Sequence, residues 1–242
     1  MAGTFEMNFY YLFQIDTTPE GATRTWVRLA RGISSITPNN NENKDQTAYL
    51  DGNGWASSDV IGKQRTYDVV GHRVVGDPAQ DYIASKELAL GDDCKTNFQA
   101  FDSRGRKISG SVTINAVTIG GGDAQGKVDF ACSLDLNGEP ALVVEAAAEA
   151  LTKTVTAATT TVGCTTFAAT AGEGNSLAYK LTAATQTAYA NGYPGLLTAY
   201  TSGADIPATA GQYLGMYELD ANKRVVKFAV VLLKASDIKS AT

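Results

Sequence analysis

Residues 64–75 read QRTYDVVGHRVV, and this stretch decides how the rest of the chain is interpreted. Alternation of β-branched and aromatic residues with polar ones is typical of a β-strand. Twelve residues at about 3.3 Å each span roughly 40 Å, which is long for a strand. Both sides of this strand mix apolar and charged groups, with Thr66, Asp68, Val70 and His72 on one side and Arg65, Tyr67, Val69 and Arg73 on the other. We therefore expect a sheet buried partly by its own domain and partly by copies of itself.

The composition fits a globular chain of one large or two small domains. The chain has 242 residues, of which 44% are hydrophobic, enough for a core. Residues 1–140 hold 13 Lys and Arg against 18 Asp and Glu, whereas residues 141–242 hold 7 of each and are rich in Ala and Thr. This shift predicts two domains, residues 1–145 and 150–242. No run of apolar residues is long enough to span a membrane. No cluster of Lys and Arg indicates a surface that binds nucleic acid.

The first domain is predicted to be mainly antiparallel β structure with one short helix. Residues 9–15 and 23–30 are expected to form a hairpin, and residues 94–102, 107–119 and 126–136 three further strands joined by turns at 103–106 and 120–123. The last of these alternates most clearly, and its apolar face is predicted to hold Val128, Phe130, Cys132, Leu134 and Leu136. A change of parity within residues 107–119 predicts a bulge near Gly110 or Asn115. Asp77 and Pro78 have the pattern of a helix N-cap followed by the first helical position, which places the helix over about 78–88.

Residues 33–58 lack any clear periodicity, and we expect them to form a long loop. The stretch contains Pro38, a run of asparagines and the sequence GNGW. Loops of this length inside a compact domain are uncommon and usually functional. Its aromatic residues either fold the loop onto its own domain or anchor it on a neighbour, because aromatic side chains are favoured at interfaces.

The second domain is predicted to be a small all-β module of sandwich or Ig-like type. Strands are expected over residues 152–156, 164–170, 175–181, 212–219 and 224–233, and the last two are joined by a compact turn at 220–223.

The residues that usually carry chemistry do not assemble into a recognisable pattern. His72 is the single histidine, and no nucleophile-elbow sequence accompanies it. The cysteines, Cys94, Cys132 and Cys164, match neither a disulfide framework nor a zinc site. The pairs Asp92–Asp93 and Asp129–Asp135 are interpreted as solvated charges rather than as glycosidase acids. We therefore expect no enzyme activity, no metal and no cofactor.

Residues 1–140 resemble the major tail proteins, or tail tube proteins, of long non-contractile-tailed phages. The resemblance rests on MAGTFEMNFYYLFQID, TWVRLARGISSITP, the polar stretch through DGNGWASSDVIG, GKQRTYDVVGHRVVGDPAQDYIASKEL and the closing FACSLDLNG. Residues that include TSGADIPATAGQYLGMYELDANKRVVKFAVVLL resemble the accessory β modules appended to such proteins.

The resemblance implies a tail-tube-type antiparallel β-sandwich whose subunits form hexameric rings that stack into a hollow tube. It implies a virion component, assembled in the host cytoplasm, that passes DNA without holding it and meets the tape measure, initiator and terminator proteins. It gives residues 33–58 the role of a contact between subunits or rings, carried by Asn39, Asn40, Asn41, Glu42, Lys44, Asp45, Tyr49 and Trp55. The long strand would join neighbouring sheets through Arg65, Tyr67, Asp68, His72 and Arg73.

Two other hypotheses stay open at this stage. A carbohydrate-binding or adhesin-type module is the first, because the second domain contains tyrosine-bearing segments at 188–191 and 193–200. A hydrolase with an unrecognised site at His72 or at Asp92–Asp93 is the second.

Overall fold

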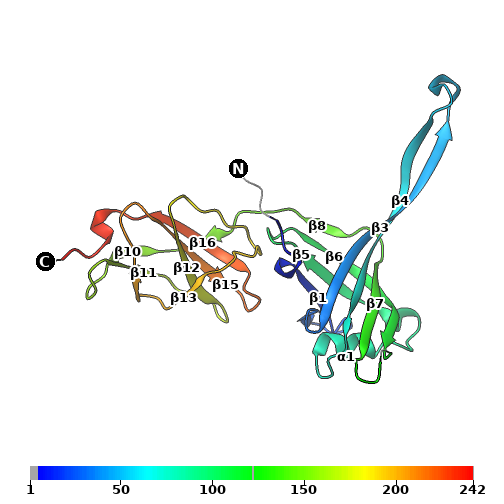
Figure 1. Ribbon diagram of the computed structural model, residues 1–242, viewed down its shortest axis with the longest axis horizontal. Coiled ribbons are helices and arrows are strands. Elements are labelled where there is room, and N and C mark those ends of the chain that lie inside the picture. The colour runs from blue at the N-terminus through cyan, green and yellow to red at the C-terminus, as the bar shows by residue number, and fades with distance from the viewer. Residues whose placement is uncertain (1–4, 122, 242) are drawn as a thin grey trace. The chain divides into compact units, whose positions relative to one another are not determined.

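The computed structural model describes residues 5–121 and 123–241, and the chain forms two compact units of antiparallel sheets (Figure 1). Met1–Thr4, Thr242 and Gly122 of the predicted turn lie outside the described residues. The sheet unit comprises residues 12–100 and 108–142, and the C-terminal unit comprises residues up to 11, 101–107 and from 143 onward. The prediction of a mainly β chain with antiparallel sheets and one short α-helix is confirmed.

The sheet unit is built on one sheet of eight strands. Seven strands follow the order β2-β1-β5-β6-β7-β4-β3, and β8 pairs with β6 off this path. The bounds are β1 Leu12–Asp16, β2 Trp26–Arg28, β3 Ile33–Ala48, β4 Ala56–His72, β5 Lys95–Phe101, β6 Lys107–Ile119, β7 Asp129–Leu136 and β8 Ala141–Val143. Short 3-10 turns, η2 Leu50–Gly52 and η3 Gly91–Cys94, precede β4 and β5.

The sheet curls over its own core. The ring of Tyr67 on β4 lies 4.9 Å from that of Phe98 on β5, although β6 and β7 separate these strands in the sheet order. Both side chains are buried, at 2% and 0% exposure. The core between the curled ends also contains Ile15, Val69, Ile83, Val112, Ile114, Phe130, Leu134 and Leu136. Burial of this apolar face at roughly 25 cal/mol per Å² is the main term that holds the unit together.

Two local predictions in this sheet are confirmed. Strand β7 alternates, with Phe130, Cys132, Leu134 and Leu136 buried and the intervening residues more exposed, but it begins at Asp129, and Val128, expected on the same face, is 48% exposed. The register of β6 against β7 shifts after Asn115, where Ala116 adopts a φ of 48°, so the bulge lies at the second of the two expected positions.

The α-helix, α1, begins at Pro78 and ends at Ala84, a few residues short of the predicted end. The Asp77 side chain caps it by accepting a hydrogen bond from the Gln80 amide at 3.0 Å. Gln80 is fully buried, accepts from the Val74 amide at 2.7 Å and donates to the Arg31 carbonyl at 2.6 Å. The helix therefore ties the link between β2 and β3 to the segment that follows β4.

The expected loop over residues 33–58 was wrong. Strand β3 occupies 33–48 and pairs antiparallel with β4 down to the pair Ala48↔Ala56, so β4 begins eight residues before the predicted start at 64. Strand β4 also ends at His72 rather than at Val75. Apolar alternation arises from burial on one face, and residues 39–48 are exposed throughout, so they carry no such signal. Pro38 is accommodated because β3 is an edge strand.

The C-terminal unit is a sandwich of two sheets. One sheet has the order β10-β11-β14 and the other β13-β12-β15-β16-β9. Phe167 and Ile206 of the first sheet share a core with Leu177, Leu214 and Met216 of the second. The bounds are β9 Glu149–Ala150, β10 Thr154–Ala157, β11 Cys164–Ala168, β12 Ser176–Thr182, β13 Thr198–Tyr200, β14 Asp205–Pro207, β15 Tyr213–Leu219 and β16 Val225–Leu232, with 3-10 turns η1 Asn8–Tyr10 and η4 Ala235–Asp237.

Segments distant in sequence complete this unit. The Arg224 guanidinium, 3% exposed, donates to the Asp102 carbonyl at 2.7 Å, to the Asn191 carbonyl at 3.2 Å and to the Tyr10 carbonyl. The ring of Tyr10 stacks on that of Tyr193 at 4.8 Å. Residues near the N-terminus and the turn before β6 thus belong to the C-terminal unit, although we expected each domain to be continuous in sequence.

Two glycines of β4 give a matched test of how tightly the sheet closes. A Cβ at Gly71 would lie 2.3 Å from the Gly32 carbonyl oxygen, whereas a Cβ at Gly62 would meet nothing closer than 3.6 Å. We expect Gly71→Ala to lower the free energy of unfolding by about 1–3 kcal/mol, because the backbone must shift. Gly62→Ala is expected to stay within about 0.5 kcal/mol of the original chain. Chemical denaturation of both variants measures the difference, and equal stabilities would contradict it.

Candidate assembly interface

Residues 39–65 form an arm that leaves the rest of the sheet. Strand β4 pairs with β7 only from Thr66↔Asp135 to His72↔Asp129, and beyond Thr66 its described pairing is with β3 alone. The ten residues 39–48 extend roughly 30 Å at about 3.3 Å each. Figure 1 shows this two-stranded ribbon projecting beyond the neighbouring strands of its sheet.

Polar cross-strand pairs stabilise the arm near its root. Glu42 lies opposite Lys63, and their charged groups are 3.2 Å apart. Lys44 approaches Glu42 at 3.4 Å. Hydrogen bonding from Lys63, and then from Lys44, lowers the pKa of Glu42 below its ordinary value. The Arg65 guanidinium donates to the Asn40 side chain at 2.7 Å.

The outer half of the arm has less favourable cross-strand contacts than the root. The register shifts between Asn43 and Lys44, which leaves Ile61 as the extra residue of a bulge. Asp45 then lies directly opposite Asp59, and like charges at such a position are destabilising. An isolated two-stranded ribbon is marginal in water, and both of its outer backbone edges are free to pair. These features point to an arm that is stabilised by contact with another molecule.

The tip of the arm, residues 49–55, presents large apolar side chains to solvent. Tyr49 is 59% exposed, Leu50 fully exposed and Trp55 83% exposed. The turn between them uses Asn53 at φ 51° and Gly54 at φ 85°. Of the two alternatives for these aromatics, folding back onto their own domain is not observed. Clustered exposed aromatic and aliphatic side chains mark interaction sites.

The outer face of the sheet near the arm is acidic and polar. Asn39 donates to Asp68 at 2.6 Å, and the single Ser133 hydroxyl proton lies within reach of both Asp68, at 2.9 Å, and Asp135, at 3.1 Å. His72, half-exposed, lies 3.7 Å from Asp129 on the same face. These bonds order the carboxylates along the face without neutralising them.

The residues predicted on the long strand divide between different environments. Tyr67 is a core residue and offers no contact surface, while Arg65 lies over its ring at 5.0 Å. Asp68 and His72 lie on the outer face. Arg73, just past β4, binds Asp81 and the Val74 carbonyl and so anchors α1. The residues predicted on the loop, by contrast, all lie on the arm or its tip.

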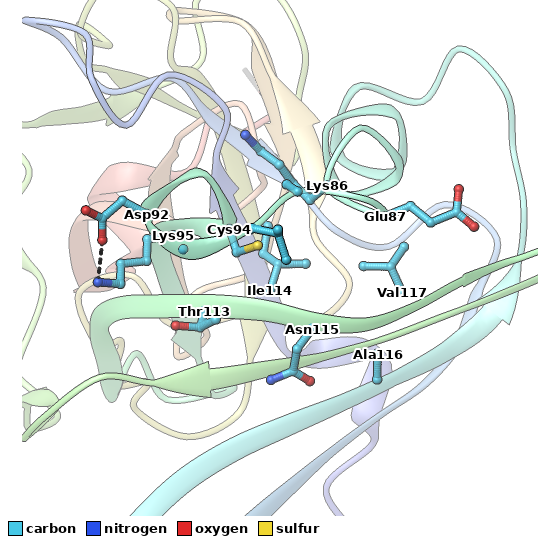
Figure 2. Close-up of a pocket in the computed structure, with 13 residues that line it drawn as sticks. Lys86, Glu87, Asp92, Cys94, Lys95, Thr113, Ile114, Asn115, Ala116 and Val117 are labelled. Carbon is cyan, nitrogen blue, oxygen red and sulfur yellow. Dashed lines mark hydrogen bonds and ion pairs between the residues drawn. The ribbon is translucent and has the colours of Figure 1, made fainter.

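One feature near the helix had no signal in the sequence. A pocket of about 440 Å³ lies between the segment 86–95 and the bulged end of β6 (Figure 2). Leu90, Ile114 and Val117 supply apolar lining, and Lys86, Cys94 and Lys95 lie around it. The pocket depends on a bulge and on an irregular segment that meet only in the fold, so periodicity does not reveal it.

Within residues 5–121 and 123–241 no group of three or more His, Cys, Asp or Glu side chains could hold a metal ion. Asp92 forms an ion pair with Lys95 at 2.6 Å. Among the described residues, none of the helices has the length and apolar character needed to cross a membrane.

A known sequence family matches part of the C-terminal unit. Residues 152–236 match the S-layer protein SbsC C-terminal domain. No curated protein sequence matches the chain.

Several solved structures share part of the chain path. A chain in the tail of an empty gene transfer agent (GTA) particle with C6 symmetry is 15% identical, with a TM-score of 0.46, and the match covers 58% of this chain and all of that one. A chain of the native GTA virion is 13% identical at the same TM-score and coverage. Domains 7, 8 and 9 of the S-layer protein SbsC are 22% identical, with a TM-score of 0.37, over 56% of this chain and 38% of theirs. At these values we transfer neither function nor assembly from those proteins.

The Glu42–Lys63 pair predicts a measurable acid response of the arm. Because the folded arm lowers the pKa of Glu42, the pair stabilises the arm above the ordinary carboxyl pKa, and the stabilisation is lost as pH falls through the lowered value. We expect an NMR titration to place the Glu42 pKa below the ordinary value of a glutamate carboxyl. Lys63→Met should raise the Glu42 pKa toward the ordinary value and speed amide exchange in the arm. An unchanged Glu42 titration in Lys63→Met would contradict this assignment.

Proposed function

We propose that this chain is a structural virion protein, the subunit of a phage tail tube that stacks as rings into a conduit for DNA. The observation that carries the proposal is the arm: a marginal ribbon about 30 Å long with an exposed apolar tip. Such a ribbon is stabilised when a neighbouring copy covers it, and the resemblance of residues 1–140 to tail tube proteins assigns this stretch to contacts between subunits.

The charge distribution supports the same function. Asp68, Asp129 and Asp135 share the outer face of the sheet, and the chain has a net charge of −5. DNA is held by Lys and Arg contacts to phosphate, so an acidic wall favours passage over binding. We propose that the rings are six-fold. The proposed partners are the tape measure, initiator and terminator proteins of the tail. The proposed location is the virion, after assembly in the host cytoplasm.

Electron microscopy of the concentrated protein tests the proposal. Negative staining is expected to show rings or hollow tubes of uniform diameter, with or without seeding by a tail initiator protein. Removing the apolar tip by Tyr49→Ser, Leu50→Ser and Trp55→Ser together should abolish tubes, because these side chains are the proposed contacts with a neighbouring copy. The thermal unfolding midpoint should be unchanged, because all three side chains are exposed and contribute no core packing.

A matched variant controls for general surface effects. Leu196→Ser removes an equally exposed leucine from the C-terminal unit and should leave tubes intact. A protein that stays monomeric at high concentration, even with an initiator, would overturn the tail tube assignment.

A second candidate function concerns the C-terminal unit alone. Its match to an S-layer protein domain favours a module displayed on a surface, with carbohydrate binding or adhesion as the role. Binding of the full chain to a panel of cell-wall glycans, lost when Tyr189 and Tyr193 of the tyrosine-bearing segments are replaced by Ala, would support it. Absence of binding across the panel would remove it.

A further inference from the structure

The pocket beside α1 has the character of a receptor for an apolar side chain. Its volume, about 440 Å³, falls in the range of roughly 300–1,000 Å³ typical of sites that take ligands. Ile114 is buried at its base, and Leu90 is 85% exposed at its margin. In Figure 2 the labelled side chains of Ile114, Val117 and Cys94 lie around this space, with Lys86 above.

The rim of the pocket carries one lysine, Lys86, whose ammonium group can meet an incoming carboxylate. Lys95 is engaged with Asp92 at 2.6 Å. Lys86 forms no ion pair among the described residues, and its ammonium lies 5.0 Å from the centre of the Tyr82 ring. An incoming carboxylate therefore has a positioned cation to meet.

The arm extends away from the rows of the sheet along which the pocket lies. Pocket-lining residues Thr113 and Asn115 of β6 pair with Asp135 and Ser133 of β7, so the pocket lies along the rows that begin at Asp135. The arm leaves β4 at the row Thr66↔Asp135 and continues in the direction away from those rows. Figure 1 agrees, since within this unit the ribbon of β3 and β4 extends away from α1. The arm of a chain therefore runs away from its own pocket.

We propose that the pocket receives the arm tip of a second copy of this chain. The tip offers Leu50 and Trp55 as apolar anchors, and Asp51 is the single charged residue of 49–55, placed to meet Lys86. A contact between two different surfaces of the same protein is heterologous, and it propagates copies in one direction. This inference rests on the proposed function and deepens it by naming the partner surface of the arm.

Disulfide trapping tests the contact with a native thiol. Cys94 lines the pocket and is partly exposed, whereas Cys164 is buried and burial raises the pKa of Cys132 to about 12. Asp51→Cys and Asn53→Cys, each made separately, place a second thiol on the tip. Mild oxidation of either variant should give a ladder of disulfide-linked oligomers on a non-reducing denaturing gel.

Two controls make the trapping specific. Adding Cys94→Ser to each tip variant should abolish the ladder. Gln64→Cys, at the exposed root of the arm, should give none, because that position is remote from the tip. Since a disulfide needs Cβ atoms about 3.8 Å apart, the same samples are also treated with a flexible bismaleimide.

Charge exchange gives an independent readout. Asp51→Lys and Lys86→Asp should each reduce assembly roughly fivefold at a fixed protein concentration, as expected for one ion pair. The double variant should restore it. Lys127→Asp, the same change at another exposed lysine of the sheet unit, should have no effect.

The outcomes separate this inference from the proposed function. Tubes that form without a Cys94-dependent ladder under either treatment, and without rescue in the double variant, would overturn the pocket contact and leave the tail tube assignment standing. A ladder formed by a protein that makes no rings or tubes would support the contact and overturn the tail tube assignment. A small molecule that co-purifies in the pocket and persists in assembled tubes would overturn the contact.

Discussion

Strand β4 is the element on which the sheet unit depends, because it takes part in two different environments along its length. Its C-terminal half pairs with both β7 and β3 and inserts Tyr67 and Val69 into the core. Its N-terminal half pairs with β3 alone and buries almost nothing. The stable half fixes the register of the exposed half, because a slip by one residue would move Tyr67 to the outer face. The body of the sheet thus aims and holds an arm that would be marginal alone.

The curl of the sheet gives the unit its second constraint. Contact between Tyr67 and Phe98 requires β4 and β5 to face each other across the core, and the close approach of Gly71 to the Gly32 carbonyl requires both glycines. The short helix α1 then joins the segment after β4 to the link between β2 and β3, because the buried Gln80 side chain bonds Val74 and Arg31. The arm continues from one end of this closed sheet, and the pocket lies along the rows that begin where the arm leaves it.

The arm combines stable and unstable features in a graded order. Near the root, Glu42 and Lys63 or Asn40 and Arg65 satisfy one another across the strands. Farther out, a bulge and the facing pair Asp45 and Asp59 weaken the ribbon, and the tip exposes its aromatics. This gradient suits a segment that stays ordered at its base and becomes fully ordered when its tip is covered.

The sequence by itself determined the elements whose signal is local. Alternation identified β7, the Asp77–Pro78 pair identified the start of α1, and a change of parity located the bulge in β6, because burial on one face and capping leave their pattern in adjacent residues. It also indicated that 39–55 carry aromatic residues on a polar segment. The tertiary structure alone decided that this segment is a β-ribbon, that its aromatics stay exposed, that Tyr67 is core, and that a pocket lies between 86–95 and β6. A strand exposed on both faces has no hydrophobic period, and a pocket is formed by residues that only the curled sheet brings together.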